Sequence, residues 1–311
     1  MVQREYGLDV ALELQELTEP IPGEGQVRIR VGATGLHPGD RHVMRGRPYV
    51  LRLMGFGLRR PRQPVPGTDV AGRVEAVGPG VTRLRPGDAV FGSTRGALAE
   101  QVVAGADMFA RRPEGLSAAE AAVVPESGLT ALRALRDLGE VAPGARVLVV
   151  GASGGVGTFA VQIAKALGAT VTGVASARNA DLVRALGADR VVAYDAEHAP
   201  THTGPHDVVL DAVGSQPIRD LRRLLAPRGV LVLVGGQGGR MLGGVGRFAG
   251  AAIRSPFVPQ RLRPLIGGDE PPGADLDALT RMIESGHVRP VIEREFSFHE
   301  AADAMRRLDD A

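Results

Sequence analysis

Val147-Leu-Val-Val-Gly-Ala-Ser-Gly-Gly-Val-Gly157 runs directly into Thr158-Phe-Ala-Val-Gln-Ile-Ala-Lys-Ala-Leu167. The apolar run that ends in glycines predicts a buried strand, and the Ala-rich segment after it predicts a helix. Such a turn directs backbone N–H groups and the positive end of the helix dipole at a pyrophosphate. Ala152 stands where the strict Gly-x-Gly-x-x-Gly pattern has its first glycine, but the spacing to Gly154 and Gly157 is kept.

We therefore expect a dinucleotide to bind at this turn. The alternative is a glycine turn that serves only the close packing of helix on strand. The residues expected to contact the dinucleotide are Ala152, Ser153, Gly154, Gly155, Val156 and Gly157.

The end of the next expected strand, at 170–174, bears on which nicotinamide cofactor is bound. NAD enzymes usually place a carboxylate there to accept a hydrogen bond from the ribose 2′-hydroxyl. This chain has Ser176 and Arg178 instead, and its next carboxylate is Asp181. A hydroxyl and a guanidinium suit a 2′-phosphate, which favours NADPH. The alternative is that Arg178 is a solvated residue at the start of a helix.

Strand and helix patterns alternate from residue 113 to residue 270, which predicts a doubly wound parallel sheet. Residues 1–112 contain short strand patterns at 26–31, 70–77 and 89–91, separated by Gly- and Pro-rich turns. Helical patterns at 275–284 and 300–308 follow the parallel sheet. We expect an α/β Rossmann domain (113–270) inserted into a β-rich domain (1–112 and 271–311).

Composition narrows the function further. The 311 residues include no cysteine, which excludes disulfides, thiolate nucleophiles and sulfur-ligated metal sites. The chain has 37 basic and 35 acidic residues, so its net charge is small. The pI of about 9.5 is therefore weak support for a nucleic-acid partner, and we expect none. No apolar run is long enough to span a membrane, and no charged-then-apolar leader opens the chain. We expect a cytoplasmic protein.

These residues resemble a zinc-independent member of the medium-chain dehydrogenase/reductase superfamily, of the quinone oxidoreductase type. The resemblance implies a Rossmann domain inserted into a split, β-rich GroES-like catalytic domain, a cleft between the two, and a homodimer. Besides the glycine turn, the matching segments are Pro22-Gly-Glu-Gly-Gln-Val27, Gly67-Thr-Asp-Val-Ala-Gly72, Glu75-Ala-Val-Gly-Pro-Gly80, Arg85-Pro-Gly-Asp-Ala-Val-Phe91, Leu129-Thr-Ala131, Leu186-Gly-Ala-Asp189 and Asp211-Ala-Val-Gly214.

The same resemblance implies further cofactor contacts. Thr130, Val213, Gly214 and Gly235 should line the cofactor. Tyr194 matches a tyrosine that approaches the 2′-phosphate in similar enzymes, although a buried tyrosine at a strand end is the alternative.

Zinc-dependent relatives bind their catalytic metal through a Cys, a His-Glu pair and a second Cys or His. In this chain the first position falls on His37, the pair on Thr68-Asp69, and the last near Ser127. Only His37 would ligate zinc well, so we expect no metal site.

Without a metal, hydride transfer to a quinone or enone needs another donor for the oxyanion that forms. Tyr49 resembles the proton-donating tyrosine of related enoyl reductases, with a packing role as the alternative. His37 could polarise a carbonyl or be a hydrogen-bonded loop residue, and Asp40 could assist it or cap a turn. After Tyr49, Arg52, Arg59, Arg60 and Arg62 form a basic loop that either is simply solvated or selects an anionic substrate.

The sequence thus predicts a zinc-independent, NADPH-dependent oxidoreductase that transfers hydride to a small-molecule quinone or α,β-unsaturated carbonyl. One alternative is an enoyl-thioester reductase. Another is an NADPH-binding sensor or adaptor with little turnover.

Overall fold

Two compact units make up the computed structural model, which describes residues 1–7, 12–196, 203–235, 244–265 and 272–310. The first unit comprises Met1–Glu126, Glu270–Glu284 and Pro290–Ala311, and the second comprises Ser127–Asp269 and Ser285–Arg289. The first unit extends beyond residue 112 because the helix that follows packs against its sheet. Among the described residues, no helix has the length and apolar character needed to cross a membrane.

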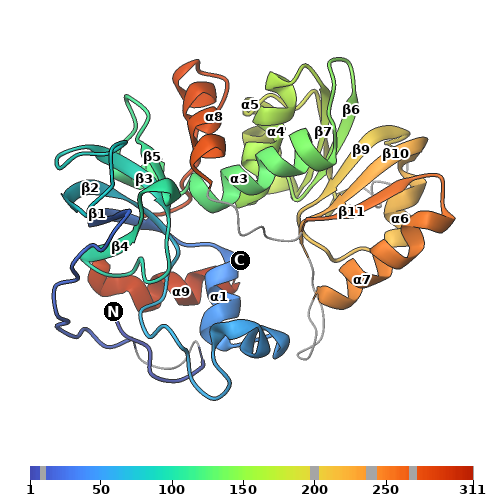
Figure 1. Cartoon of the computed structure of the whole chain (residues 1–311). Coiled ribbons are helices and arrows are strands. Elements are labelled where there is room, and N and C mark those ends of the chain that lie inside the picture. Colours follow the sequence, from blue (N-terminus) through green and yellow to red (C-terminus); the bar gives the residue numbers. More distant parts are fainter. Residues whose placement is uncertain (8–11, 197–202, 236–243, 266–271, 311) are drawn as a thin grey trace. The chain divides into compact units, whose positions relative to one another are not determined.

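An antiparallel sheet organises the first unit, with the strand order β4-β1-β2-β3-β5 (Figure 1). Its core is formed by side chains from alternate strand positions, among them Ile29 and Phe109, which are fully buried. The strands are β1 (Gln26–Gly35), β2 (Asp69–Val77), β3 (Ala89–Ser93), β4 (Gln101–Gly105) and β5 (Phe109–Arg111).

Helices complete this unit. Helix α2 packs against β1 and β2, α8 packs against β5, and α9 packs against α1. Their bounds are α1 (Pro38–Arg45), α2 (Ala118–Ala122), α8 (Gly273–Glu284) and α9 (Ala301–Asp310), with short π- or 3-10 turns η1 (Arg52–Phe56), η2 (Ala106–Met108) and η6 (Phe298–Glu300). Ser117 and Glu120 form the expected capping box at the start of α2.

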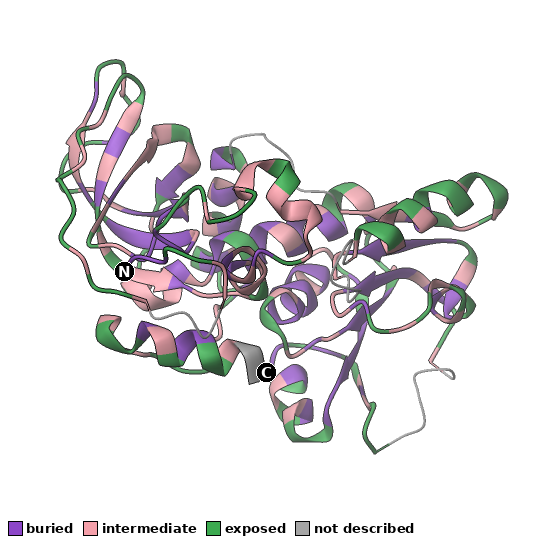
Figure 2. Ribbon diagram, turned by 90° about the horizontal axis from the view of Figure 1, so that it is seen from below, coloured by how far each residue is buried: buried purple, intermediate pink, exposed green. Residues whose placement is uncertain are grey.

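A six-stranded parallel sheet forms the second unit, with the strand order β11-β10-β9-β6-β7-β8. Its strands are buried along most of their length, as Figure 2 shows. They are β6 (Arg146–Val150), β7 (Thr170–Ala175), β8 (Arg190–Ala193), β9 (His206–Asp211), β10 (Leu225–Leu233) and β11 (Arg261–Pro264). The predicted α/β class, with a Rossmann-type parallel sheet beside a β-rich unit, is confirmed.

The helices of the second unit cross between consecutive strands, as parallel pairing requires. Helices α4 and α5 pack against β6, β7 and β8, whereas α6 and α7 pack against β10 and β11. They are α3 (Pro125–Arg133), α4 (Gly155–Ala166), α5 (Ala180–Ala185), α6 (Ile218–Arg223) and α7 (Val245–Arg254), with η3 (Ala134–Leu138), η4 (Ala177–Asn179) and η5 (Ser255–Phe257).

The chain reverses its direction of travel through the sheet between β6 and β9, which are neighbours in space. Ligands of doubly wound sheets bind beside the carboxyl ends of the strands at such a switch point. The register pairs Val150 with Asp211 and with Val174, so these strand ends lie at one edge. The glycine turn after β6 begins at this edge.

Candidate functional site

The glycine turn leaves the start of α4 accessible to a ligand. Gly154 is the N-cap residue, and no side chain caps the helix. A Cβ on Gly154 would approach only the carbonyl oxygen of Gly151, at 3.5 Å, whereas a Cβ on Gly157 would lie 2.0 Å from the same oxygen. Gly157 is therefore needed for close packing of helix on turn, and Gly154 leaves space for a pyrophosphate at the helix N-terminus.

The next two strand ends bring Ser176, Arg178 and Tyr194 to this edge. Ala175 and Ala193 are register partners at the ends of β7 and β8, and the N–H of Tyr194 donates to the oxygen of Ala175 at 3.1 Å. Ser176 is buried and Arg178 is exposed. Tyr194 is 59% exposed, which rules out the buried-tyrosine alternative. The two strand ends therefore expose Arg178 and Tyr194, whereas Ser176 is buried there.

Val213, Gly214 and Gly235 lie in the two turns after β9 and β10. The N–H of Gly235 donates to the oxygen of Asp211 at 3.0 Å, and a Cβ on Gly235 would lie 2.4 Å from the oxygen of Ala212. The two turns thus touch through backbone atoms. Thr130 lies in the same unit, half-buried on α3.

The carboxylate of Asp211 fixes the first of these turns. It accepts hydrogen bonds from the N–H groups of Val213 and Gly214, and it pairs with the guanidinium of Arg247 on α7. Arg247 also donates to the carbonyls of Gly214 and Gln216. Burial raises the pKa of Asp211, although Gly214 and Arg247 favour its charged form. Sequence reasoning gave Arg247 no role in this turn.

In the first unit, His37 lies between β1 and α1, as the N-cap residue of α1. Its Nδ1 accepts from the N–H of Gly39 at 3.1 Å, and the carboxylate of Asp40 accepts from the N–H of His37 at 3.1 Å. Because Nδ1 is an acceptor, the neutral ring carries its proton on Nε2. That proton faces Thr68 Oγ1, 2.7 Å away, whose hydroxyl donates to Asp40 at 3.2 Å. Asp40 therefore acts at least as a cap, as one of the two readings predicts.

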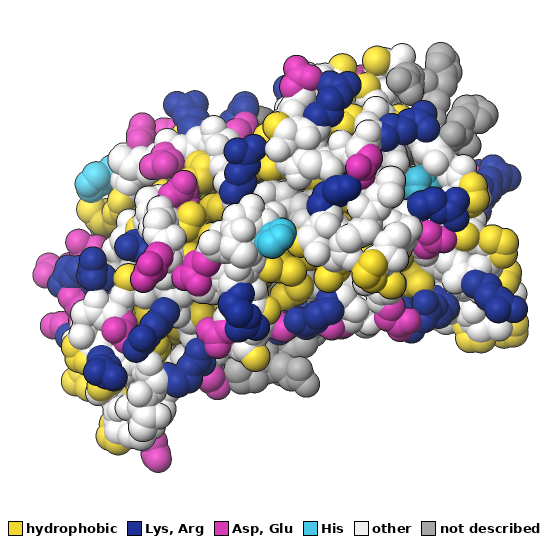
Figure 3. Space-filling model, turned by 90° about the horizontal axis from the view of Figure 1, so that it is seen from above, with side chains coloured by type: hydrophobic (Ala, Val, Ile, Leu, Met, Phe, Trp, Pro, Cys, Tyr) yellow, Lys and Arg dark blue, Asp and Glu magenta, His cyan; other side chains and the backbone are white. Residues whose placement is uncertain are grey.

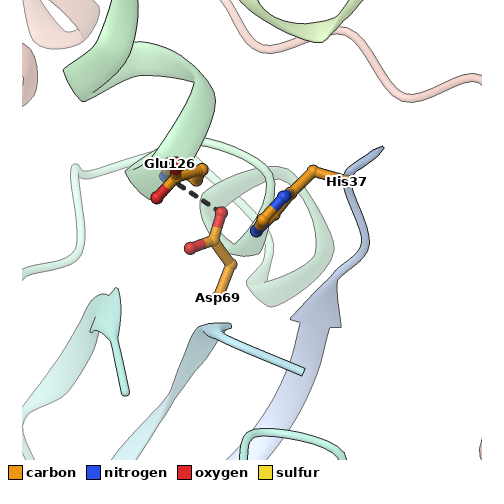
Figure 4. Close-up of side chains that lie close together, drawn as sticks. All are labelled: His37, Asp69 and Glu126. Carbon is orange, nitrogen blue, oxygen red and sulfur yellow. Dashed lines mark hydrogen bonds between the residues drawn. The ribbon is translucent and has the colours of Figure 1, made fainter. Parts of the chain in front are cut away.

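Asp69 and Glu126 lie beside His37, as Figure 4 shows. One ligand atom from each of the three residues lies within 4.8 Å of the other two. The carboxylate of Asp69 accepts from Ser93 Oγ at 2.9 Å and from the N–H of Glu126 at 3.0 Å. Sequence reasoning considered Ser127 at this position and missed Glu126. Glu126 directly precedes Ser127 in the sequence, and its carboxylate could have been recognised there as a possible metal ligand.

Burial and neighbouring charges act in opposite directions on the pKa values of this cluster. It raises the pKa of Asp69 to about 7, with the positive charge of His37 opposing the shift. Burial alone would lower the pKa of His37, but the charges of Asp40, Asp69 and Glu126 raise it. The pKa of Asp40 is raised by burial against the effect of His37. The cluster therefore holds a proton that is exchanged close to neutral pH.

Tyr49 lies in the loop between α1 and η1, in the same unit as His37. Its ring is half-buried, with the guanidinium of Arg52 4.8 Å and that of Arg47 5.9 Å from the ring centroid. No hydroxyl contact joins Tyr49 to the rest of the described chain. A role for Tyr49 as a proton donor stays a prediction.

Comparisons with known proteins agree with this architecture. One family model that matches is described as an alcohol dehydrogenase GroES-like domain, over residues 23–134, and another as a zinc-binding dehydrogenase, over residues 186–311. The chain is 32% identical over 321 residues to the chloroplast envelope quinone oxidoreductase homolog of Arabidopsis thaliana, covering 98% of this chain and 93% of that protein.

Two further similarities are to a solved enoyl reductase and to a polyketide synthase component. The solved structure of CurK enoyl reductase matches with a TM-score of 0.86 and 26% identity, covering 99% of this chain and 96% of that one. The pikromycin polyketide synthase component PikAII of Streptomyces venezuelae is 38% identical over 302 residues. That match covers 94% of this chain, which spans only 8% of the synthase component.

A GroES-like unit joined to a dinucleotide-type parallel sheet defines a two-domain nicotinamide-dependent oxidoreductase. This chain belongs to the medium-chain dehydrogenase/reductase superfamily, among its quinone oxidoreductase-like members.

A zinc ion is the metal that this superfamily implies, and the cluster around His37 does not fit it as the side chains lie. A histidine ligates zinc through an unprotonated ring nitrogen. Here Nδ1 accepts from Gly39 and Nε2 carries the proton that faces Thr68, so neither nitrogen has a free lone pair. We therefore derive no chemical step through a metal.

Proposed function

We propose that this protein is an NADPH-dependent, zinc-independent reductase of small quinones or α,β-unsaturated carbonyl compounds. The observation that carries the proposal is the accessible N-terminus of α4 at the switch point of the sheet, in a chain that belongs to a family of oxidoreductases. When bound, the nicotinamide supplies a hydride to the substrate. A homodimer in the cytoplasm is the assembly and location that we expect.

Selection of NADPH over NADH rests on the ends of β7 and β8. The guanidinium of Arg178 supplies a charge for the 2′-phosphate, and the hydroxyls of Ser176 and Tyr194 supply hydrogen-bond donors. The carboxylate of Asp195, after β8, accepts from the N–H of Ala177 at 2.8 Å and so lies against the start of η4.

Protonation of the reduced substrate falls to side chains of the first unit. Tyr49 has a hydroxyl with no partner among the described residues, and two arginines lie against its ring. The Nε2 proton of His37 faces Thr68, and Thr68 in turn donates to Asp40. Either group can donate to the developing oxyanion. We favour Tyr49 because the proton of His37 is already engaged.

Enoyl-thioester reduction is the second candidate, and the similarity to CurK enoyl reductase favours it. It uses the same hydride transfer and the same donors, and differs in the substrate. An NADPH-binding sensor with little turnover would have the same cofactor site.

One assay separates these functions. Purified protein is mixed with NADPH or NADH and with 9,10-phenanthrenequinone, a 2-alkenal or a crotonyl thioester, before and after dialysis against EDTA, and nicotinamide absorbance is followed. We expect substrate-dependent oxidation with kcat/KM at least tenfold higher for NADPH than for NADH, and no effect of EDTA. Binding of NADPH without oxidation across this panel would indicate the sensor, and loss of the rate on chelation would refute zinc independence.

A further inference from the structure

The positive charge of the chain is concentrated in one segment. Residues 41–68 contain seven arginines and no aspartate or glutamate. The remaining chain therefore has 30 basic residues against 35 acidic ones, although the whole protein has a formal charge of +2. All of the positive excess thus lies between Asp40 and Asp69.

Five of the seven arginines of this segment lack a carboxylate partner among the described residues. Elsewhere, just over half of the described arginines have a carboxylate at ion-pair distance, for example Arg146 with Asp207 and Arg261 with Glu140. Figure 3 shows basic and acidic side chains interspersed over one face of the molecule. In contrast, Arg47, Arg52, Arg59, Arg60 and Arg62 form no ion pair with any described carboxylate.

The backbone of this segment is held in a defined conformation. Tyr6 donates its hydroxyl proton to the carbonyls of Phe56 and Gly57, at 2.8 and 2.6 Å. The guanidinium of Arg52 lies 4.3 Å from the ring centroid of Tyr6, and it donates to the carbonyl of Gly46 at 2.9 Å. The three exposed arginines that follow are therefore presented by an anchored loop, which lowers the entropic cost of binding an anion.

Apolar side chains lie in the same loop. Leu53, Met54 and Leu58 are 77%, 64% and 65% exposed, more than most large apolar residues of this chain. Tyr49, which we favour as proton donor, lies at the start of the loop with Arg47 and Arg52 against its ring. Guanidinium groups beside exposed apolar side chains suit a ligand with both an apolar body and an anionic group.

We propose that Arg59, Arg60 and Arg62 recognise an amphiphilic anionic substrate: a quinone or enone whose apolar body carries a sulfonate-, phosphate- or carboxylate-type group. This inference rests on the proposed reductase function and specifies its substrate class. The arginines bind the anionic group while the reducible group lies towards Tyr49. Their contribution is to substrate affinity, because the anionic group takes no part in hydride transfer.

The test uses a pair of quinones that differ in one charged group, 1,2-naphthoquinone and 1,2-naphthoquinone-4-sulfonate. The variant is R59Q/R60Q/R62Q. The control is R184Q/R223Q/R306Q, which removes the same charge from exposed arginines that each pair with an aspartate three residues earlier. KM and kcat are measured with NADPH for both quinones in low and high salt, and thermal unfolding checks that each variant folds.

We expect R59Q/R60Q/R62Q to raise KM for the sulfonate about fivefold, with KM for the neutral quinone unchanged within twofold and kcat unchanged for both. In the wild type, salt should raise KM for the sulfonate only, and the variant should lose most of this rise. The inference is wrong if the control variant raises KM for the sulfonate equally, or if neither variant changes it. If the wild type reduces neither these quinones nor the enones of the panel above, the proposed reductase function itself fails, and this inference with it.

Discussion

Asp69 has a pKa far above the ordinary value of an aspartate. Its carboxyl is buried, accepts two hydrogen bonds, and lies beside His37 and Glu126. With a pKa of about 7 in the folded protein against an ordinary 3.8, it makes the folded state bind more protons than the unfolded state between about pH 4 and pH 7. The free energy of unfolding therefore falls as the pH rises through this window.

Asp69→Asn should remove most of this pH dependence. An asparagine can still accept from the N–H of Glu126 and can donate to Ser93 Oγ, so the shape of the site is kept. The fall in unfolding free energy between pH 4.5 and pH 8 should shrink by as much as about 3 kcal/mol. Denaturant unfolding at pH 4.5 and at pH 8 measures this change in unfolding free energy. Asp107→Asn, at an exposed position, is the control. An unchanged fall in the variant would refute the raised pKa.

At this scale the sequence predicts the residue types of the site but not their partners. His37, Asp40 and Asp69 stand in recognisable motifs, whereas Glu126 is brought to them only by the turn into α3. The tautomer of His37 depends on the N–H of Gly39, and that contact exists only because His37 caps a helix. Chain patterns do not encode such contacts directly.

Among the elements, the turn from β6 into α4 matters most for function. Its two glycines at 154 and 157 have different tasks. A side chain on Gly157 would overlap backbone atoms of Gly151 and Ala152. Gly154, in contrast, has open space beside the uncapped start of the helix. One glycine therefore maintains the packing of α4, and the other leaves room for the cofactor.

Alanine at each position should separate these tasks. In Gly157→Ala, the Cβ would overlap the oxygen of Gly151, so we expect the unfolding free energy to fall by roughly 2–4 kcal/mol. Gly154→Ala has room for its Cβ, so stability should change by less than about 1 kcal/mol while NADPH binds at least tenfold more weakly. Thermal unfolding and titration calorimetry measure both. Equal stability of the two variants would contradict these different roles.

Element prediction succeeds where hydrophobic periodicity is strong and fails where capping is unusual. The buried strand 146–150 and the helix after it follow from apolar runs and glycine placement. His37-Pro-Gly-Asp40 is predicted as a turn, but it opens α1, because histidine replaces the usual serine or aspartate at the N-cap. The short strands β4, β5 and β11 form by pairing with neighbouring strands. Their own sequences show little of the hydrophobic alternation that predicts a strand.

At the scale of the whole molecule, one unit provides a nucleotide edge and the other provides a cluster of protonatable side chains. The class of oxidoreductase follows from the order of motifs along the chain, and family matches confirm it. The substrate does not follow from those motifs, because loops such as the one after α1 vary independently of the fold. In this chain that loop carries Arg59, Arg60 and Arg62, which form no ion pair with a described carboxylate, and we expect it to determine substrate choice.

Direct hydride transfer is the central claim, and isotope transfer tests it. The protein is incubated with [4,4-²H₂]NADPH and trans-2-hexenal in ordinary water, and the saturated aldehyde is examined by mass spectrometry and NMR. Our account predicts hexanal that carries one deuterium, at C3, because the nicotinamide delivers its hydride there and the protein supplies an unlabelled proton at C2. Hexanal without deuterium at C3, or bound NADPH that neither hexenal nor a quinone oxidises, would contradict the account.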